Sequence, residues 1–181
     1  MKTRESIDYL LLGALMRGPK HGYEIMQFLE QNFDQAWYVS TSQLYTVLKR
    51  VERKKWVVSQ VEAQETRPAK RVFDLSPAGR ARFLGWLREP VRHIRDMRIE
   101  FIGKLFFSDY LDREEITRLI AAQQEILTDA RGSLIRKLAR ETSPFKRLVL
   151  SSKLNTVETW LNWLTESASP YVEAMNKGKQ L

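Results

Sequence analysis

Residues 40–56 read STSQLYTVLKRVERKKW, and this stretch decides the fold. Its aliphatic residues are spaced at i, i+3, i+4 and i+7, the period of one helical face: Leu44, Val47, Leu48 and Val51. The hydroxyl-rich start at residues 40–42 can accept an orphan backbone N–H and cap a helix. The stretch therefore predicts an amphipathic helix with one buried face.

The opposite face of this helix is polar and carries no acidic residue, with Tyr45 at its border. At roughly 100° per residue, six side chains share it: Ser42, Gln43, Thr46, Lys49, Arg50 and Arg53. Amides and guanidinium groups read base edges, whereas hydroxyls and ammonium groups hold phosphates. The face indicates a helix that enters the DNA major groove; a merely solvated charged face is the alternative.

The flanking segments predict a winged helix-turn-helix domain over residues 1–89. An apolar helix over residues 6–16 stops at Gly18-Pro19, and a second helix opens near His21. After the polar-faced helix, residues 57–63 and 70–75 alternate as two strands of a hairpin around the turn at residues 65–69. A lone hairpin is unstable in water, so it must pack on the helices as a wing.

The wing tip is basic through Arg67, Lys70 and Arg71. These cations are placed to contact the DNA backbone beside the groove that the helix occupies. The alternative is that they only keep the hairpin soluble. A further helix starts at Ser76-Pro77, with serine as cap and proline in the first turn, and ends near residue 89.

Residues 90–181 are predicted to form a helical domain, so the fold class is mainly α. Residues 97–111 are rich in apolar side chains, and Asp112 with Glu115 resembles a capping box. After a break at Ser143-Pro144, leucines and a valine between residues 150 and 164 follow heptad spacing. This seam must be buried, either against the first domain or against a second copy; we favour a second copy, which makes this the dimerisation domain.

Charge is distributed unevenly along the chain. The net charge is +8 and the pI is about 9.8, and residues 41–71 hold eight Lys and Arg against three Glu. Such a focused basic patch suggests a polyanionic partner. The chain has no cysteine, no apolar run near ~18 residues and no signal-peptide core, so we expect a cytoplasmic protein without a membrane span.

Catalytic chemistry is not indicated. The two histidines have no Cys, His or carboxylate cluster around them with metal-ligand spacing, and the eight glycines form no phosphate loop. We expect no enzyme activity and no cofactor.

Three of the tryptophans are candidates for binding a small-molecule effector. Aromatic side chains near a domain junction could stack a small aromatic ligand, which makes Trp37, Trp86 and Trp163 candidates for a pocket. Ordinary core packing is the alternative for each of them.

Several motifs resemble the PadR-like transcriptional regulators in order and spacing across residues 7–88. They are YLLLGAL at residues 9–15, Gly18-Pro19, HGYEI at 21–25, Ser40, QLY at 43–45, Leu48, Arg50, Arg67-Pro68, Lys70-Arg71 and SPAGR at 76–80. The later segments RIEF at 98–101 and KLFF at 104–107 are similar to the longer-tailed branch that includes virulence activators. The resemblance implies a homodimeric winged-helix DNA-binding protein, and many relatives are repressors released by a small, often aromatic, ligand such as a phenolic acid.

This sequence departs from the family pattern at a few positions. Thr46 stands where the family commonly has Pro, which adds a hydroxyl to the DNA face. Thr66 and Phe73 replace a Gly and a Tyr of the wing, and Lys55-Trp56 replaces Gly-Leu after the recognition helix. The extra lysine could reach a phosphate.

We therefore expect a sequence-specific regulator that binds double-stranded DNA as a homodimer. Gln43, Thr46 and Arg50 are predicted to contact base edges. The predicted phosphate contacts are Ser42, Tyr45, Lys49, Arg53, Arg67, Lys70 and Arg71. The alternative function is a winged-helix protein-interaction module whose basic face meets an acidic protein.

Overall fold

The computed structural model describes residues 3–36, 38–62 and 70–178. The chain divides into two compact units, described separately below. One contains residues 1–87 together with 98–103, and the other contains residues 88–97 together with 104–181. The contiguous domains predicted from the sequence, 1–89 and 90–181, thus differ from these units in that the short segment 98–103 clusters with the first.

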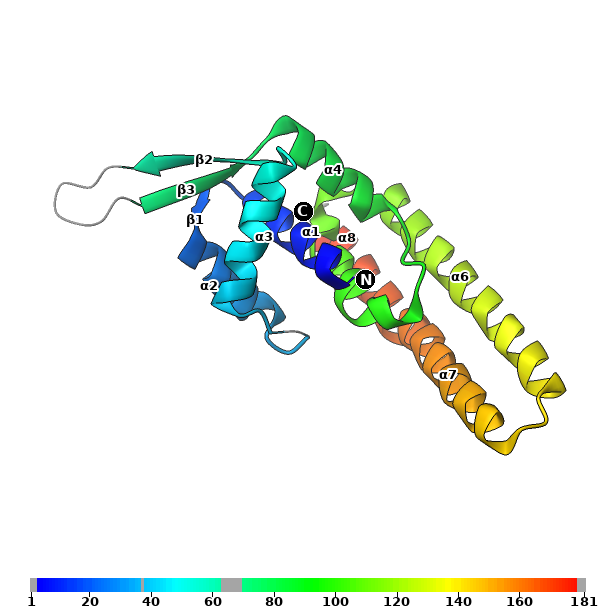
Figure 1. Cartoon of the computed structure of the whole chain (residues 1–181). Coiled ribbons are helices and arrows are strands. Elements are labelled where there is room, and N and C mark those ends of the chain that lie inside the picture. Colours follow the sequence, from blue (N-terminus) through cyan, green and yellow to red (C-terminus); the bar gives the residue numbers. More distant parts are fainter. Residues whose placement is uncertain (1–2, 37, 63–69, 179–181) are drawn as a thin grey trace. The chain divides into compact units, whose positions relative to one another are not determined.

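The first unit is a winged helix, as predicted. Its elements are α1 (Thr3–Leu15), β1 (Lys20–His21), α2 (Gly22–Phe33), α3 (Thr41–Arg53), β2 (Val57–Glu62), β3 (Lys70–Leu75) and α4 (Pro77–Arg88). The strands form an antiparallel sheet in the order β1-β3-β2, and the β2–β3 hairpin projects beyond the helices (Figure 1). The sequence does not predict β1, because two residues are too few to show an alternation.

Helix α3 forms as its pattern predicts. Ser40 caps it, since the backbone N–H of Gln43 donates to the Ser40 Oγ at 3.2 Å and the Ser40 N–H donates to the Gln43 Oε1 at 3.1 Å. The four residues of the apolar stripe are all buried: Leu44, Val47, Leu48 and Val51. Burial of each such side chain contributes roughly 1.5–3 kcal/mol, so this stripe fixes which face of α3 is left for solvent.

The end of α3 is a Schellman motif. The Trp56 N–H donates to the Val51 carbonyl at 3.0 Å and the Lys55 N–H to the Glu52 carbonyl at 2.8 Å. Lys55 occupies the left-handed position of this motif with φ of 59°. That position explains why the family commonly has glycine there.

An aromatic stack closes the core of the first unit. The rings of Tyr9 and Trp86 lie parallel with centroids 4.8 Å apart, and Trp56 stacks on the same tyrosine at 6.2 Å. The indole N–H of Trp86 donates to Glu100 at 3.0 Å, and the Ser6 hydroxyl donates to the same carboxylate at 3.3 Å. These bonds explain why residues 98–103 cluster with the first unit.

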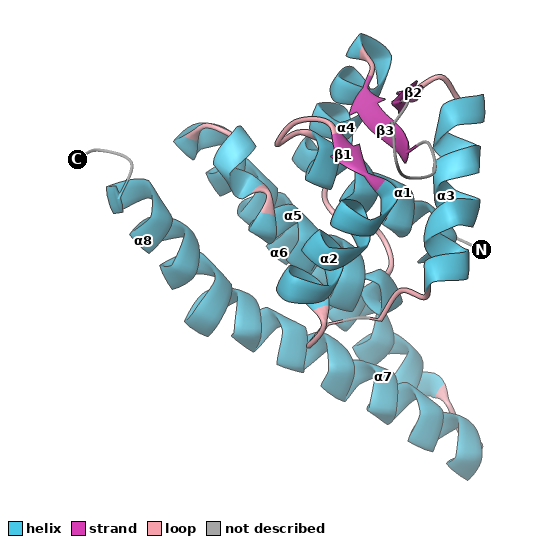
Figure 2. Ribbon diagram, turned by 90° about the vertical axis from the view of Figure 1, so that its left-hand side faces the viewer, coloured by secondary structure: helices cyan, strands magenta, loops and turns pink. Residues whose placement is uncertain are grey.

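The second unit contains the long helices α6 (Arg113–Arg140) and α7 (Pro144–Trp163), a π-helix (Leu164–Ala168) and α8 (Ser169–Gly178). Asp112 and Glu115 form the predicted capping box, in which the Glu115 N–H donates to Asp112 at 2.7 Å. Helices α6 and α7 run side by side as a hairpin (Figures 1 and 2). Part of the heptad seam therefore packs within the chain, because Val157 and Leu164 are fully buried.

The apolar segment before α6 is more broken than the sequence suggests. It consists of a 3-10 turn (Ile94–Asp96), a π-helix (Met97–Phe101), the short helix α5 (Ile102–Phe106) and another 3-10 turn (Ser108–Tyr110). The buried Gln123 of α6 anchors the preceding backbone, since its amide donates to the Val91 carbonyl at 3.0 Å and accepts from the Val91 N–H at 2.6 Å. Over the described residues, none of the helices has the length and apolar character needed to cross a bilayer.

Gly79→Ala should destabilise the protein by about 1–3 kcal/mol, because an added methyl would overpack the start of α4. A Cβ at Gly79 would lie 2.0 Å from the carbonyl oxygen of Trp56, whereas a Cβ at Gly85 meets nothing within 4 Å. The matched control Gly85→Ala should instead add up to about 1 kcal/mol through helix propensity. Urea unfolding followed by circular dichroism measures both; equal effects would contradict the packing argument.

Lys55→Gly should stabilise the protein by roughly 1 kcal/mol, since glycine adopts the left-handed conformation without the Cβ clash. Arg53→Gly, two residues earlier and inside α3, is the matched control and should destabilise by about 1 kcal/mol. Thermal unfolding distinguishes them. A loss of stability in Lys55→Gly would show that the lysine side chain contributes more than its backbone conformation costs.

Candidate nucleic-acid interface

The solvent face of α3 is the centre of the candidate interface. Its exposed side chains are Thr41, Ser42, Gln43, Tyr45, Thr46, Lys49 and Arg53. None of these is acidic, and Glu52, the one acidic residue of α3, is half-buried and paired with Arg71 of the wing. The exposed strip thus combines an amide, hydroxyls and cations, a set that suits phosphates and base edges.

The exposed strip lies between two hollows. One, of about 280 Å³, is lined by Ile7, Ser42, Gln43, Thr46, Val47 and Arg50. The other, of about 350 Å³, is lined by His21, Gly22, Tyr23, Tyr45, Leu48, Lys49, Glu52, Lys70, Arg71 and Phe73. Apart from Arg53, which lines neither hollow, the predicted contact residues of α3 therefore divide into two groups, and α3 stands as a ridge between the hollows.

Two of the predicted base contacts also make local hydrogen bonds. The Gln43 carbonyl oxygen holds the Ser40 N–H in the capping box, and the Thr46 hydroxyl donates to the Ser42 carbonyl at 2.9 Å. The amide NH₂ of Gln43 can still donate to DNA, and the lone pairs of the Thr46 hydroxyl oxygen can still accept from it. These bonds pre-set the side-chain directions, which lowers the entropy that binding must remove.

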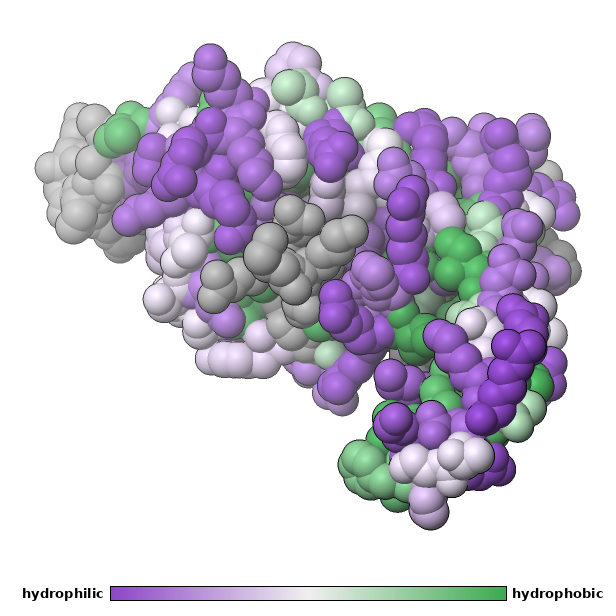
Figure 3. All heavy atoms as spheres, turned by 45° about the vertical axis from the view of Figure 1, so that its right-hand side comes forward, coloured by the Kyte–Doolittle hydropathy of each residue, from purple (hydrophilic) through white to green (hydrophobic). Residues whose placement is uncertain are grey.

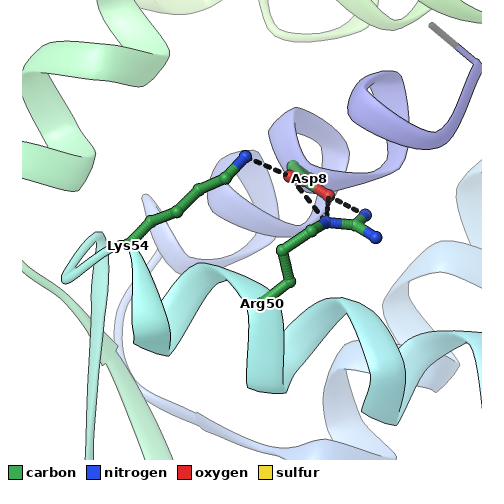
Figure 4. A network of polar contacts seen from close by, with 3 residues as sticks. All are labelled: Asp8, Arg50 and Lys54. Carbon is green, nitrogen blue, oxygen red and sulfur yellow. Dashed lines mark hydrogen bonds and ion pairs between the residues drawn. The ribbon is translucent and has the colours of Figure 1, made fainter. Parts of the chain in front are cut away.

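Arg50 makes an ion pair that its prediction as a base contact did not include. Its guanidinium binds the carboxylate of Asp8 on α1, with the Arg50 Nε at 3.0 and 3.1 Å from the two oxygens and a further contact from a terminal nitrogen. Lys54 donates to the same carboxylate at 3.1 Å, so both cations reach from α3 toward α1 (Figure 4). Arg50 is half-buried and Asp8 is fully buried.

This network gives Arg50 a structural task that the sequence analysis missed. A buried carboxylate without partners costs several kcal/mol, so Asp8 retains the guanidinium unless DNA offers a better partner. The signal in the sequence was an acidic residue inside the apolar face of α1, between Ile7 and Tyr9. Its partner, 42 residues away, could not be read from local spacing.

The wing is fastened to α3 through Arg71. Its guanidinium donates to Glu52 at 2.8 Å and to the Ser59 hydroxyl at 2.8 Å, and Ser59 donates to Glu52 at 2.6 Å. Half of the Arg71 side chain remains exposed. Arg71 thus positions the hairpin on α3 as well as lining the larger hollow, while Arg67 lies outside the described residues.

The start of α2 contributes residues that the site prediction omitted. Lys70 lies 5.7 Å over the ring of Tyr23, an exposed residue of α2. The Tyr45 hydroxyl packs so closely on Gly22 that a Cβ there would approach it to 2.9 Å. His21 is a helix-start residue as expected, because its N–H donates to Glu24 at 2.6 Å. The HGYE motif could have indicated these contacts.

The three candidate effector residues belong to different parts of the chain. Trp86 is buried in the stack on Tyr9 with its N–H bonded to Glu100, which is the core role given above as the alternative. Trp163 belongs to the second unit and packs edge-to-face on Trp160, with centroids 5.3 Å apart. Trp37 lies outside the described residues.

Comparison with known families matches both parts of the chain. The model of the transcriptional regulator PadR-like family matches residues 11–84, and that of the virulence activator alpha C-terminal domain matches residues 97–169. Residues 11–84 therefore form a winged-helix DNA-binding domain of the type found in PadR-like transcriptional regulators, and a C-terminal region of the virulence-activator type follows it.

Individual relatives are distant but extend over nearly the whole chain. The negative transcriptional regulator PadR of Bacillus subtilis is 27% identical, over 87% of this chain and 93% of that protein. A probable transcriptional regulator of Mycobacterium tuberculosis is 24% identical, over 93% of this chain and 98% of that protein. Among solved structures, Bacillus subtilis PadR in complex with operator DNA has a TM-score of 0.47 and 24% identity, covering 90% of this chain and 96% of that one.

Arg50→Ala should cost roughly 2–4 kcal/mol of stability, because it leaves Asp8 buried with Lys54 as its remaining partner from this network. Adding Asp8→Asn to this variant should recover part of the loss, giving a coupling energy above about 1 kcal/mol in a double-mutant cycle. Lys49→Ala, on the exposed strip, is the matched control and should change stability by less than about 0.5 kcal/mol. If Arg50→Ala is as stable as Lys49→Ala, the ion pair does not hold α3.

Proposed function

We propose that this protein binds double-stranded DNA sequence-specifically as a homodimer and acts as a ligand-responsive repressor. The observation that carries the DNA-binding part is the acid-free exposed strip of α3, which stands as a ridge between two hollows. A helix is admitted by the major groove, whose walls carry the phosphates on either side. The hollows on both flanks leave room for those walls.

The chemistry on the two flanks supports different tasks. On one flank, Ser42, Gln43 and Thr46 present an amide and hydroxyls with no ammonium group. On the other flank, Lys49 and Lys70 line the larger hollow together with Tyr45 and Arg71. We infer that the first group meets base edges and that the second, with Arg53, holds the phosphate backbone.

A base contact by Arg50 requires a change in its ion pair with Asp8. The donors that Arg50 now directs at Asp8 can contact a base only by leaving that carboxylate, and the new partner must compensate for this exchange. Arg67 stays a predicted wing contact. The guanidinium of Arg71 reaches a phosphate from its exposed half while it remains bonded to Glu52.

Repression and ligand response are supported by relatives. The curated Bacillus subtilis relative is named a negative transcriptional regulator, and structures of that protein are titled as complexes with operator DNA and with p-coumaric acid. We extend both properties to this chain as proposals. A homodimer follows from the two-fold symmetry that a major-groove reader and its operator usually share.

Binding to the duplex upstream of the protein's own gene tests the DNA-binding proposal. Fluorescence anisotropy against random duplex, from 50 to 200 mM salt, should show a preference of about 10³ or more and a steep salt dependence. Added phenolic acids should then weaken the specific complex. Weak and equal binding of this duplex, of random duplex and of operators selected from a random pool would instead favour a protein-interaction module.

Lys49→Ala and Lys70→Ala should each weaken specific and random duplex alike and flatten the salt dependence by about one unit per lost phosphate contact in each subunit. Gln43→Ala should weaken the specific duplex by about 1–3 kcal/mol more than the random one. Arg118→Ala, an exposed cation on α6, is the matched control with no expected effect. An unchanged salt slope in Lys49→Ala and Lys70→Ala would remove the larger hollow from the interface.

A further inference from the structure

Basic residues are concentrated at the end of α3 and in the turn after it. Within residues 49–55 the cations are Lys49, Arg50, Arg53, Lys54 and Lys55. The one acidic residue of that stretch, Glu52, is paired with Arg71. At the upper left of Figure 3, hydrophilic side chains dominate the surface beside the hairpin. Cations at this density on a DNA-facing helix favour phosphates of any sequence.

Two of these cations are bound by a carboxylate inside the protein. The Arg50 Nε lies 3.0 and 3.1 Å from the two Asp8 oxygens, and the Lys54 Nζ lies 3.1 Å from one of them (Figure 4). Asp8 is completely buried, whereas 28% of the Arg50 side chain and 35% of the Lys54 side chain are exposed. The two cations therefore lie at the surface, and the anion that holds them lies beneath it.

A phosphate of random DNA is a weak competitor for these cations. If both cations left, the Asp8 charge would remain unpaired in the interior, which is strongly destabilising. An ion pair at the exposed surface of a duplex returns little free energy, because water and salt screen it. The Lys54 ammonium also lies 4.3 Å from the centre of the Trp56 ring. Both cations should therefore stay with Asp8 when the protein meets random DNA.

We propose that Asp8 withholds Arg50 and Lys54 from the phosphate backbone and thereby lowers the affinity of this protein for random DNA. Asp8 is thus a positioning residue, which acts through the two cations. The inference rests on the DNA binding of the proposed function and adds a residue that sets its strength. Because random sites greatly outnumber operators in a genome, weaker random binding leaves more of the protein available for the operator.

The position of Arg50 makes this restraint relevant to sequence readout. Arg50 lines the smaller hollow together with Gln43 and Thr46, the flank assigned to base edges. Phosphate contacts carry no sequence information, so an unrestrained guanidinium there would strengthen binding to every sequence. While Asp8 holds Arg50, the uncharged groups of Gln43 and Thr46 supply a larger share of the affinity.

Asp8→Asn in the full chain tests the proposal, since it removes the charge and keeps the shape of the side chain. It should raise the affinity for random duplex about tenfold at 100 mM salt and steepen the salt dependence by about one unit per released cation in each subunit. Fluorescence anisotropy from 50 to 200 mM salt measures both. A purely structural role for Asp8 predicts weaker binding, because α3 would be displaced, so an unchanged or lower affinity of the folded variant would overturn the proposal.

Asp74→Asn is the matched control for net charge. Asp74 is an exposed residue of β3 in the same unit, and its carboxylate accepts a hydrogen bond from the Leu75 N–H at 2.7 Å. This substitution also removes one negative charge, and it should change the affinity for random duplex less than about twofold. If it raises the affinity as much as Asp8→Asn does, net charge explains the result and the proposed restraint is wrong.

Lys54→Gln provides a test that does not depend on removing Asp8. In the wild-type background it should leave the random-duplex affinity and its salt dependence unchanged, because a withheld cation makes no phosphate contact. In the Asp8→Asn background the same substitution should remove about one unit of the added salt dependence in each subunit. A flatter salt dependence for Lys54→Gln in the wild-type background would show that Lys54 already binds a phosphate, which contradicts the proposal.

The outcomes separate this inference from the proposed function. If the wild-type protein binds no duplex, the proposed function is wrong and the inference is wrong with it. If the wild type prefers its operator while the two Asp8 and Lys54 variants fail to behave as expected, only the role of Asp8 is wrong. Thermal unfolding followed by circular dichroism shows whether each variant is folded at the temperature of the binding measurements. If Asp8→Asn is unfolded there, Lys54→Gln in the wild-type background decides.

Discussion

The carboxylate of Asp8 constrains the geometry of the DNA-binding unit. It is fully buried on α1 and bound by two cations of α3, Arg50 and Lys54. Removing such a charge from water costs free energy. The ion pairs with Arg50 and Lys54 offset this cost only while their geometry is kept. A tilt or a slide of α3 along α1 would leave the carboxylate unpaired, so the recognition helix has one favoured position. Lys54 extends this constraint, because it also lies 4.3 Å over the ring of Trp56.

The wing depends on the same helix. Arg71 ties β3 to Glu52, which is the one acidic residue of α3. One ion pair therefore fixes β3 on α3 and also pairs the one negative charge of that helix. The position of β3 thus depends on the position of α3.

Periodicity and capping predicted the local elements because those signals are local. The stripe from Leu44 to Val51, the Ser40 cap and the Asp112 capping box all operate within one or two turns, and the structure has each of them. The task of Arg50 could not be predicted this way. On a helical wheel it lies with the polar face, and only the tertiary contact with Asp8 shows that it faces α1. Likewise, residues 97–111 are apolar enough for one helix but divide into three short pieces, and hydrophobic content alone does not specify where such breaks fall.

The net charge of +8 hides two basic regions with different surroundings. In residues 41–71, the exposed strip of α3 combines cations with hydroxyls, and its exposed aromatic side chain, Tyr45, ends in a hydroxyl. Residues 131–153 hold seven Lys and Arg against one Glu, and this stretch includes the exposed side chains of Phe145 and Leu148. Net charge alone would predict a polyanionic partner for both regions. The neighbouring side chains distinguish the two regions. Hydroxyls and cations make phosphate contacts, whereas desolvated aromatic and aliphatic groups form the centre of a protein–protein interface. The same excess of lysine and arginine therefore has different surroundings in the two regions.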